Sequence, residues 1–382
     1  MEREIAVEGC SSRLRIHLGA LRANYRTVSK RIAPARCAAV VKANAYGLGV
    51  APVGAALYRE GCRHFFIAQM REALPLRQAT GSDAEIFILN GIDPGSETAC
   101  ADGGYVPVLN SVAQIDTWRT CARRRGRPLP AAVQIDSGMS RLGLLPATAA
   151  ELARDADLPQ EIDLRLLLTH LACADEPAHQ ANLNQLDRFR TLHTHFAAIP
   201  TSIANSGGVF LADDFHGQIA RVGIALFGVN PSPNATGLRS VIELDARVLQ
   251  IRDISQGMGV GYGLTYTAPS ARRLATIAIG YADGWPRSLG GVGAAWHDGR
   301  RLPIVGRVSM DSLTVDISSL PINALAEGDF VELLGPSQTL ADVARDAGTI
   351  AYEILTRLGQ RHARVLIEDK GSIKKQMPGK YR

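Results

Sequence analysis

The sequence lacks any pair of closely spaced cysteines. Its 382 residues include six cysteines, none of them in a Cys-x-x-Cys pair. They are Cys10, Cys37, Cys62, Cys100, Cys121 and Cys173. Such scattered cysteines argue against a disulfide framework and against a thiolate metal site. We therefore expect free thiols, no bound metal and a reducing compartment, which favours the cytoplasm.

Long apolar runs and a strong net charge are also missing. No stretch approaches the about 20 apolar residues that span a bilayer, and the charged N-terminus Met1–Glu4 lacks the apolar core of a secretion signal. The formal net charge is +5, with 46% hydrophobic and 21% charged residues. This composition excludes a disordered chain. It predicts a protein with no membrane or nucleic-acid partner.

Two segments are locally basic. Arg123–Arg127 is interpreted as a solvated helix end, with an anion- or nucleic-acid-binding patch as the alternative. Lys374–Lys380 is interpreted as a mobile basic tail.

Residues 1–235 alternate short apolar runs with longer amphipathic stretches, among them Val53–Glu60, Val112–Arg124 and Ala178–Ala198. The apolar runs predict strands at Ala38–Val41, His64–Ala68, Glu85–Leu89, Tyr105–Leu109, Ala131–Ile135, Asp163–Thr169, Thr201–Ala204 and Gln218–Val222. A doubly wound sheet has the same local alternation, but eight repeats favour a (β/α)8 TIM-like barrel of the α/β class.

The residue pattern changes after Pro231–Asn234 to short β-like runs separated by turns. Residues 236–382 are therefore predicted to form a mostly β C-terminal domain. Residues 1–10 are left open between the two domains. The predicted strands are Val241–Ile251, Leu274–Ile279, Leu302–Val305, Ser312–Ile317 and Phe330–Leu333. The predicted helices are Leu340–Ala347 and Ile350–Leu358.

Catalytic residues of barrels lie at the C-terminal ends of the strands. The first predicted strand ends in Lys42. Partial burial lowers the pKa of a lysine and makes it a usable nucleophile or base. A strand-end lysine that extends its ammonium into water is the alternative, and position alone does not decide.

Two further strand ends carry charged or titratable groups. The fifth leads into Asp136–Gly143, where Arg141 could clamp a substrate carboxylate or pair with Asp136 as a loop staple. The sixth ends in His170, which taken alone is more often structural.

Small residues follow the last two barrel strands. Asn205–Gly208 and Arg221–Ile224 occupy the position at which many barrels hold a phosphate, and their backbone N–H groups could approach an anion. In the second domain, glycines flank Tyr262, and Gly306–Asp311 forms another compact loop. Either could be an ordinary turn.

A strand-end lysine, a phosphate cradle and no Rossmann-type glycine fingerprint together suggest a phosphate-bearing cofactor whose aldehyde bonds to the lysine. The residues resemble the alanine racemase family, fold-type III pyridoxal-phosphate enzymes, along nearly the whole chain. Val41–Gly47 is similar to that family's cofactor-lysine motif. Further matches are Asp136–Gly143, His170 with Ala174-Asp175, Ala204–Ser206, Arg221–Ile224, Gly261–Gly263, Thr265–Thr267, Ile279–Gly284, Gly306–Asp311 and Tyr352-Glu353.

The resemblance implies a racemase of L- and D-alanine, for peptidoglycan synthesis or alanine catabolism, with pyridoxal 5′-phosphate as cofactor and Lys42 and Tyr262 as catalytic bases. The implied cofactor-binding residues are Lys42, Tyr46, His170, Asn205, Ser206, Arg221, Gly223, Ile224 and Tyr352. The implied substrate-binding residues are Arg141, Met310 and Asp311. A homodimer with shared active sites is also implied, in which Tyr262, Met310 and Asp311 come from the partner subunit.

Racemisation needs a proton acceptor on each face of the substrate. The reference pKa of tyrosine is about 10, so Tyr262 needs cationic neighbours to act near neutrality. The family geometry implies His170 beside it and Arg221 behind His170.

Gln134 departs from the family, because many members have a carbamylated lysine there that orients the loop arginine. How Arg141 is held is therefore open. Leu48, where a histidine is common, is a minor departure. The alternatives are a broad-specificity or serine racemase, a decarboxylase of the same fold, disfavoured by Ser309-Met310-Asp311, and a non-catalytic cofactor carrier, disfavoured by the second domain.

Overall fold

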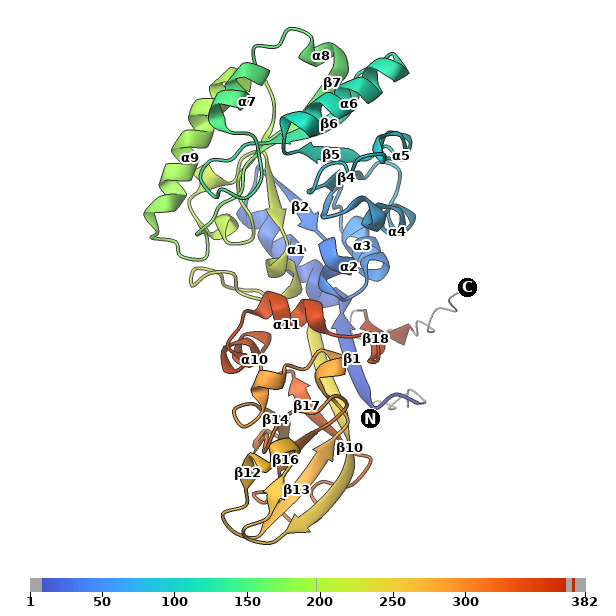
Figure 1. The fold of residues 1–382 in the computed structure, drawn as a ribbon, viewed down its shortest axis with the longest axis vertical. Coiled ribbons are helices and arrows are strands. Elements are labelled where there is room, and N and C mark those ends of the chain that lie inside the picture. The colour runs from blue at the N-terminus through green and yellow to red at the C-terminus, as the bar shows by residue number, and fades with distance from the viewer. Residues whose placement is uncertain (1–8, 197, 369–372, 375–382) are drawn as a thin grey trace. The chain divides into compact units, whose positions relative to one another are not determined.

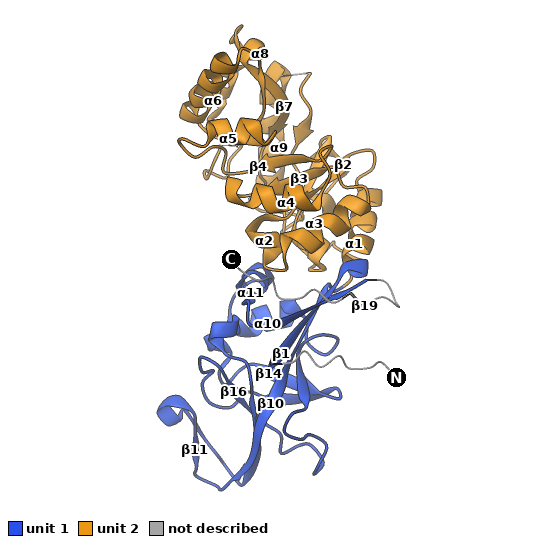
Figure 2. Ribbon diagram, turned by 90° about the vertical axis from the view of Figure 1, so that its right-hand side faces the viewer, with its two compact units in different colours: residues 1–20, 240–382 blue, residues 21–239 orange. Residues whose placement is uncertain are grey.

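The computed structural model describes residues 9–196, 198–368 and 373–374. The N-terminal Met1–Glu4, Ala197 of the predicted helix Ala178–Ala198, and residues 375–380 of the basic tail lie outside the described residues. The chain divides into two compact units, residues 21–239 and residues 1–20 with 240–382 (Figure 2). The sequence alone placed the division after residue 235.

The first unit contains an eight-stranded parallel sheet in the order β8-β7-β6-β5-β4-β3-β2-β9 (Figure 1). The strands are β2 (Arg36–Val40), β3 (His64–Ile67), β4 (Glu85–Ile88), β5 (Val106–Leu109), β6 (Leu129–Gln134), β7 (Ile162–Leu168), β8 (Thr201–Ser202) and β9 (Ile219–Val222). The N–H of Arg221 donates to the carbonyl of Ala204 at 2.9 Å, which links the two ends of the sheet. The predicted TIM-like barrel is confirmed.

The barrel strands are buried along most of their length. Phe65, Phe66 and Ile67 of β3 are fully buried, as expected where side chains fill the barrel interior on one side and pack beneath helices on the other. The helices are α1 (Leu18–Arg31), α2 (Lys42–Tyr46), α3 (Val50–Arg59), α4 (Ala73–Ala79), α5 (Glu97–Asp102), α6 (Val112–Arg125), α7 (Pro146–Leu152), α8 (Leu158–Glu161) and α9 (Gln180–His193).

The long strand β10 (Ile242–Ile254) organises the second unit. It pairs antiparallel with β1 (Ser12–His17), β13 (Arg272–Ile277) and β17 (Phe330–Leu334). The remaining strands are β11 (Gly259–Val260), β12 (Tyr266–Thr267), β14 (Ala294–His297), β15 (Arg300–Pro303), β16 (Leu313–Asp316), β18 (Ala363–Ile367) and β19 (Ile373–Lys374). The helices α10 (Leu340–Ala347) and α11 (Ala351–Arg357) complete it, and the predicted mostly β architecture is confirmed.

Strand β1 was not predicted from the sequence; it pairs with β10 on one side and with β18 on the other. Its sequence, Ser-Arg-Leu-Arg-Ile-His, buries Leu14 and Ile16, while Arg13 and Arg15 are only partly buried. This alternation is an ordinary strand signal. It was overlooked because β1 precedes the repeated strand–helix pattern of the barrel.

Candidate active site

Lys42 lies directly beyond β2 and is half-buried. Burial lowers the pKa of its ammonium below the usual value, the nearby charges of Arg141 and Arg221 lower it further, and only Glu72 opposes them. A lysine that extended into water would keep its ordinary pKa. The geometry therefore favours the nucleophile or base over the solvent-seeking alternative.

A left-handed turn follows Lys42. Ala43, Asn44, Ala45 and Tyr46 have φ values of 53°, 54°, 53° and 54°, a conformation that costs about 1–2 kcal/mol for each L-residue. The turn is held by the Asn44 side chain, whose Oδ1 accepts from the Val50 N–H at 2.8 Å. Its consequence is that the Tyr46 side chain becomes buried inside the barrel end.

The Tyr46 hydroxyl faces a glycine of the predicted phosphate cradle. A Cβ atom added at Gly223 would lie 2.1 Å from this hydroxyl. The hydroxyl of the buried Ser206 accepts from the N–H groups of Gly223 and Ala225 at 2.9 and 3.4 Å. Asn205 shapes the preceding turn, because its Oδ1 accepts from the Gly208 N–H at 2.9 Å.

Hydroxyls and backbone N–H groups thus meet beside Ile224, at the start of the 3-10 turn η5 (Ile224–Phe227). Such donors suit the oxygens of a phosphate. The structure brings together the predicted barrel residues Tyr46, Ser206, Gly223 and Ile224, and this donor set fits the phosphate of the implied cofactor.

The buried Arg221 contacts the partly exposed His170. Arg221 is 3% exposed, and its Nη1 donates to the carbonyl and hydroxyl of Ser202 at 2.8 and 2.7 Å. Its Nη2 donates to the carbonyl of Thr169 at 2.6 Å and lies 3.3 Å from Nδ1 of His170. Burial lowers the pKa of Arg221 to about 10.

The guanidinium fixes the tautomer of the imidazole, because it can donate but not accept a hydrogen bond. Nδ1 of His170 is therefore the acceptor, and the neutral ring carries its proton on Nε2. Burial lowers the pKa of His170 to about 3, with further contributions from the positive charges of Arg221, Arg141 and Lys42. His170 is neutral at physiological pH and presents an N–H donor.

Arg141 lies in a loop that is closed on itself. The N–H of Leu144 donates to the carbonyl of Gln134 at 2.8 Å, and the N–H of Asp136 donates to the carbonyl of Leu144 at 2.9 Å. Asp136 does not staple Arg141, because its Oδ1 accepts the N–H groups of Gly138, Met139 and Ser140. These bonds hold the pKa of Asp136 below its usual range against the opposing effect of burial.

The buried side chain of Gln134 supports the same loop, because its Nε2 donates to the carbonyl of Leu142 at 3.0 Å. Arg141 itself is exposed, and its guanidinium forms no hydrogen bond or ion pair with residues 9–196 and 198–368. It is therefore available for an external carboxylate.

Tyr262 lies in the second unit on the turn η6 (Tyr262–Leu264) between β11 and β12. Gly261 and Gly263 both have φ of 72°, a value that glycine adopts without strain. The base of this loop packs through Val260 into a buried cluster, whereas the Tyr262 side chain is 71% exposed.

The other predicted residues of this unit are also exposed. Met310 is 52% exposed. The carboxylate of Asp311 accepts from Nη1 of Arg361 at 2.7 Å, and Nε of the same arginine donates to the buried Asp283 at 2.7 Å. Tyr352 lies on α11 and is 39% exposed.

Comparison with known proteins identifies the family. Residues 16–231 match the model "Alanine racemase, N-terminal domain", and residues 241–366 match "Alanine racemase, C-terminal domain". The chain belongs to the alanine racemase family. The resemblance seen in the sequence, and with it the prediction of an amino-acid racemase, is confirmed.

Relatives within the family cover almost the whole chain. "Alanine racemase, catabolic" of Agrobacterium fabrum is 50% identical over 371 residues, 96% of this chain and 95% of its own. "Alanine racemase" of Brucella ovis is 47% identical over 384 residues, 97% of this chain and 96% of its own. The structure of alanine racemase from Bartonella henselae with covalently bound pyridoxal phosphate has a TM-score of 0.91 at 42% identity, covering 94% of this chain and 99% of that one.

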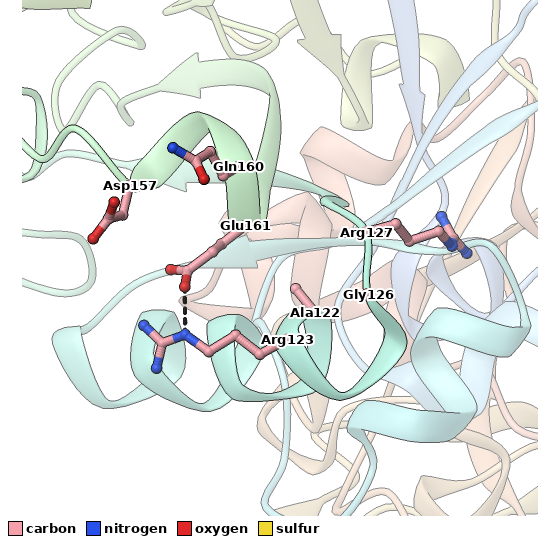
Figure 3. A pocket seen from close by; sticks show the side chains of 7 residues that line it. All are labelled: Ala122, Arg123, Gly126, Arg127, Asp157, Gln160 and Glu161. Atoms are coloured by element: carbon pink, nitrogen blue, oxygen red, sulfur yellow. Dashed lines mark hydrogen bonds and ion pairs between the residues drawn. The ribbon is translucent and has the colours of Figure 1, made fainter.

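A separate cavity of about 420 Å³ lies between α6 and α8. Its lining residues precede β6 and β7, so it belongs to the opposite end of the barrel from the racemase site. Arg123 pairs with Glu161 there, and Arg127 points away from them (Figure 3). Part of the basic run is thus neutralised by an acidic residue, as a solvated helix end would be.

Sequence reasoning missed the residues that hold the charged groups in place. Thr169 and Ser202 accept the hydrogen bonds of Arg221. Arg361 contacts Asp311. These contacts join residues far apart in the chain, and no local spacing signals them. No helix within the described residues is long and apolar enough to cross a membrane, and no group of His, Cys, Asp and Glu side chains among them could hold a metal ion.

Proposed function

We propose that this protein interconverts L-alanine and D-alanine with two opposed bases, Lys42 and Tyr262: one removes the α-proton from one face, and the other donates a proton to the opposite face. The observation that carries the proposal is the barrel end itself. There, a lysine with a lowered pKa, a neutral histidine and an unpaired arginine lie within electrostatic range of one another, next to the phosphate cradle of Tyr46 and Gly223.

The cofactor is pyridoxal 5′-phosphate, which the relative from Bartonella henselae carries covalently. Lys42 would bond to it, and Arg221 would face its ring nitrogen. The phosphate ligands would be Tyr46, Ser206, Gly223, Ile224 and Tyr352, with Asn205 shaping the turn. When bound, the cofactor supplies a conjugated system that accepts the electrons left when the α-proton departs.

Each remaining group has a task set by its chemistry. The exposed guanidinium of Arg141 binds the substrate carboxylate, for which its planar fork is suited. Lys42, uncharged more readily than an ordinary lysine, takes or returns the α-proton on one face. On the other face Tyr262 does the same, and the Nε2–H of His170 donates to its phenolate oxygen, a contact that lowers the pKa of a phenol.

We further propose that Tyr262, Met310 and Asp311 reach the site from the partner subunit of a homodimer. The exposure of Tyr262 and Met310 supports this, because both large side chains are available to a partner subunit. The test mixes two inactive variants, Lys42→Ala and Tyr262→Phe, after reversible dissociation. If each site uses both chains, about a quarter of wild-type activity returns, because half of the dimers are mixed and each has one intact site. No recovery, despite mixed dimers detected by mass, would refute shared sites.

Incubation of the purified protein with L-alanine in heavy water tests the reaction. Racemisation predicts α-deuterated alanine and D-alanine together, with both lost in Lys42→Ala. If neither α-deuterated alanine nor D-alanine forms in protein that retains its cofactor absorbance, the proposal is wrong. A panel of L-amino acids separates alanine from serine or broad specificity.

The cellular role is a further proposal. Relatives from Agrobacterium fabrum and Mesorhizobium japonicum, each 50% identical, are named catabolic alanine racemases, which supports a part in alanine catabolism. Supply of D-alanine for peptidoglycan is the alternative. A deletion strain that needs added D-alanine to grow supports peptidoglycan supply, and one that fails only on alanine as carbon source supports catabolism.

A further inference from the structure

Helix α9 carries a buried side-chain amide that contacts two loops at the racemase end of the barrel. Gln185 is 2% exposed. Its Oε1 accepts from the N–H of Ala172 at 2.8 Å. Its Nε2 donates to the carbonyl of His170 at 2.9 Å and to the hydroxyl of Ser137 at 3.3 Å. Both of its N–H groups and its carbonyl oxygen are thus used by these loops.

The two loops carry the polar groups of the proposed site. His170 and Ala172 follow β7, and Ser137 follows β6 in the closed loop that presents Arg141. The Ser137 hydroxyl is 2.7 Å from the hydroxyl of Thr169, the residue whose carbonyl accepts from Nη2 of Arg221 at 2.6 Å. The Gln185 amide therefore contacts the backbone of the His170 loop directly. It reaches Thr169 through the Ser137 hydroxyl.

The charges of the site explain why a neutral bridge is suitable. Arg141, Arg221 and Lys42 all act on His170 with the same sign, so the elements that carry them repel one another. A tether that added a positive charge would increase this repulsion, and a carboxylate would pair with a cation that the substrate or cofactor needs. An amide joins the loops without changing the charge of the site.

We propose that Gln185 is a positioning residue, whose amide fixes the loop of His170 against the loop of Arg141 so that imidazole and carboxylate clamp keep one common geometry. This inference rests on the proposed function and adds to it a residue that touches neither substrate nor cofactor. A purely structural role predicts instead that loss of the amide lowers stability and leaves the chemistry unchanged.

The test compares Gln185→Met with the wild type as cofactor-loaded enzymes. Methionine has a similar length but leaves the Ala172 N–H and the His170 carbonyl without partners. Because a misplacement of about 1 Å can cost a hundredfold in rate, we expect kcat to fall about 10- to 100-fold and KM for alanine to rise. Gln185→Glu keeps the hydrogen-bond acceptor and loses both donors, so its kcat should also fall. If Gln185→Met does not fold, Gln185→Glu is the variant to be compared with the wild type.

A matched control is available in the other unit. Gln338 is also buried, and its Nε2 donates to the carbonyls of Ala294 and Leu333 at 3.1 and 2.7 Å. Gln338→Met should lose thermal stability as Gln185→Met does, with kcat within about twofold of wild type because its contacts adjoin none of the charged groups.

A second readout does not depend on turnover. In protein labelled with ¹⁵N-histidine, His170 is assigned by its loss in His170→Gln. In the wild type its ring should stay neutral, with the proton on Nε2, from pH 5 to pH 8. In Gln185→Met the loop loosens and water reaches the ring, so His170 should titrate within that range.

The outcomes distinguish the positioning role of Gln185 from the proposed function. An unchanged His170 spectrum together with kcat equal to that of Gln338→Met would overturn the positioning role, whatever the reaction is. A changed spectrum in a protein whose wild type racemises no amino acid would leave the positioning role intact and refute the proposed function.

Discussion

The guanidinium of Arg221 lies 3.3 Å from Nδ1 of His170, and Arg221 is buried. A cation beside a histidine opposes protonation of the ring, and burial opposes it more strongly still. The pair therefore keeps one proton on Nε2 and none on Nδ1 over the physiological range. The sequence led us to expect cationic neighbours for Tyr262, and His170 is instead neutral, with an Nε2–H that can donate a hydrogen bond.

The first prediction concerns stability as a function of pH. The folded chain does not protonate His170 until about pH 3, whereas the reference value is 6.5. Between these values the unfolded chain binds a proton that the folded chain does not. The free energy of unfolding should therefore fall as pH decreases through this window, by about 1.4 kcal/mol per pH unit from this group.

Urea unfolding of cofactor-free protein at pH 6.5, 5.5 and 4.5 measures this slope. His170→Gln should show a shallower fall, and His195→Gln, which removes an exposed histidine, should match the wild type. Equal slopes in wild type and His170→Gln would mean that His170 is protonated in the folded chain.

The second prediction tests the phosphate cradle. A Cβ at Gly223 would lie 2.1 Å from the Tyr46 hydroxyl, so Gly223→Ala must displace the tyrosine or the backbone N–H groups. We expect the affinity for pyridoxal phosphate to fall at least about tenfold, as for a change that disturbs charge-assisted hydrogen bonds by 1.5 kcal/mol or more.

Equilibrium dialysis of the cofactor measures this change. The double variant Gly223→Ala with Tyr46→Phe removes the clashing oxygen and should bind more tightly than Gly223→Ala alone. Additive losses in the double variant would show that the hydroxyl and the glycine do not share a site.

Much of this barrel could be predicted because its signals are local. The apolar runs placed all eight strands, and the ends of those strands led to Lys42, His170 and Arg221. The left-handed turn at Ala43–Tyr46 was not predicted, because alanine and tyrosine rarely adopt a positive φ. The turn buries Tyr46, and this packing depends on the folded barrel rather than on the local sequence.

The supporting residues were missed for the same reason. Gln185 is separated from His170 by 15 positions, and Arg361 is separated from Asp311 by 50. Neither distance is a recurring spacing of a helix or strand, so only the folded structure brings the partners together. The roles of Tyr262, Met310 and Tyr352 toward substrate or cofactor stay predictions.

The third prediction answers how Arg141 is held in a chain with Gln134. The Gln134 amide donates to the Leu142 carbonyl at 3.0 Å, next to the arginine. Gln134→Leu removes this donor, and the looser loop should raise KM for alanine about fivefold to tenfold with a smaller change in kcat, as expected for lost substrate binding of about 1 kcal/mol.

Steady-state kinetics in both directions measure the effect. Leu142→Ala is the control, because the bond uses the backbone carbonyl and the side chain is 44% exposed. An equal rise of KM in Leu142→Ala would assign the effect to the leucine side chain, and no rise in Gln134→Leu would show that Arg141 is held by other contacts.

The fourth prediction concerns the second unit, where Arg361 joins the buried Asp283 to the exposed Asp311. Arg361→Met leaves Asp283 with its bond from the Gly280 N–H at 2.9 Å but without a countercharge, which should destabilise the unit by about 1–3 kcal/mol. It also removes the hydrogen bond to Asp311, so kcat/KM should fall more than the loss of stability alone explains.

Asp311→Asn separates the two effects, because it weakens the exposed contact and keeps the buried pair. Thermal unfolding should then stay near the wild type while kcat/KM falls. If Asp311→Asn keeps full kcat/KM, the loop that bears Met310 and Asp311 does not need this arginine, and the role of Arg361 is confined to stabilising Asp283.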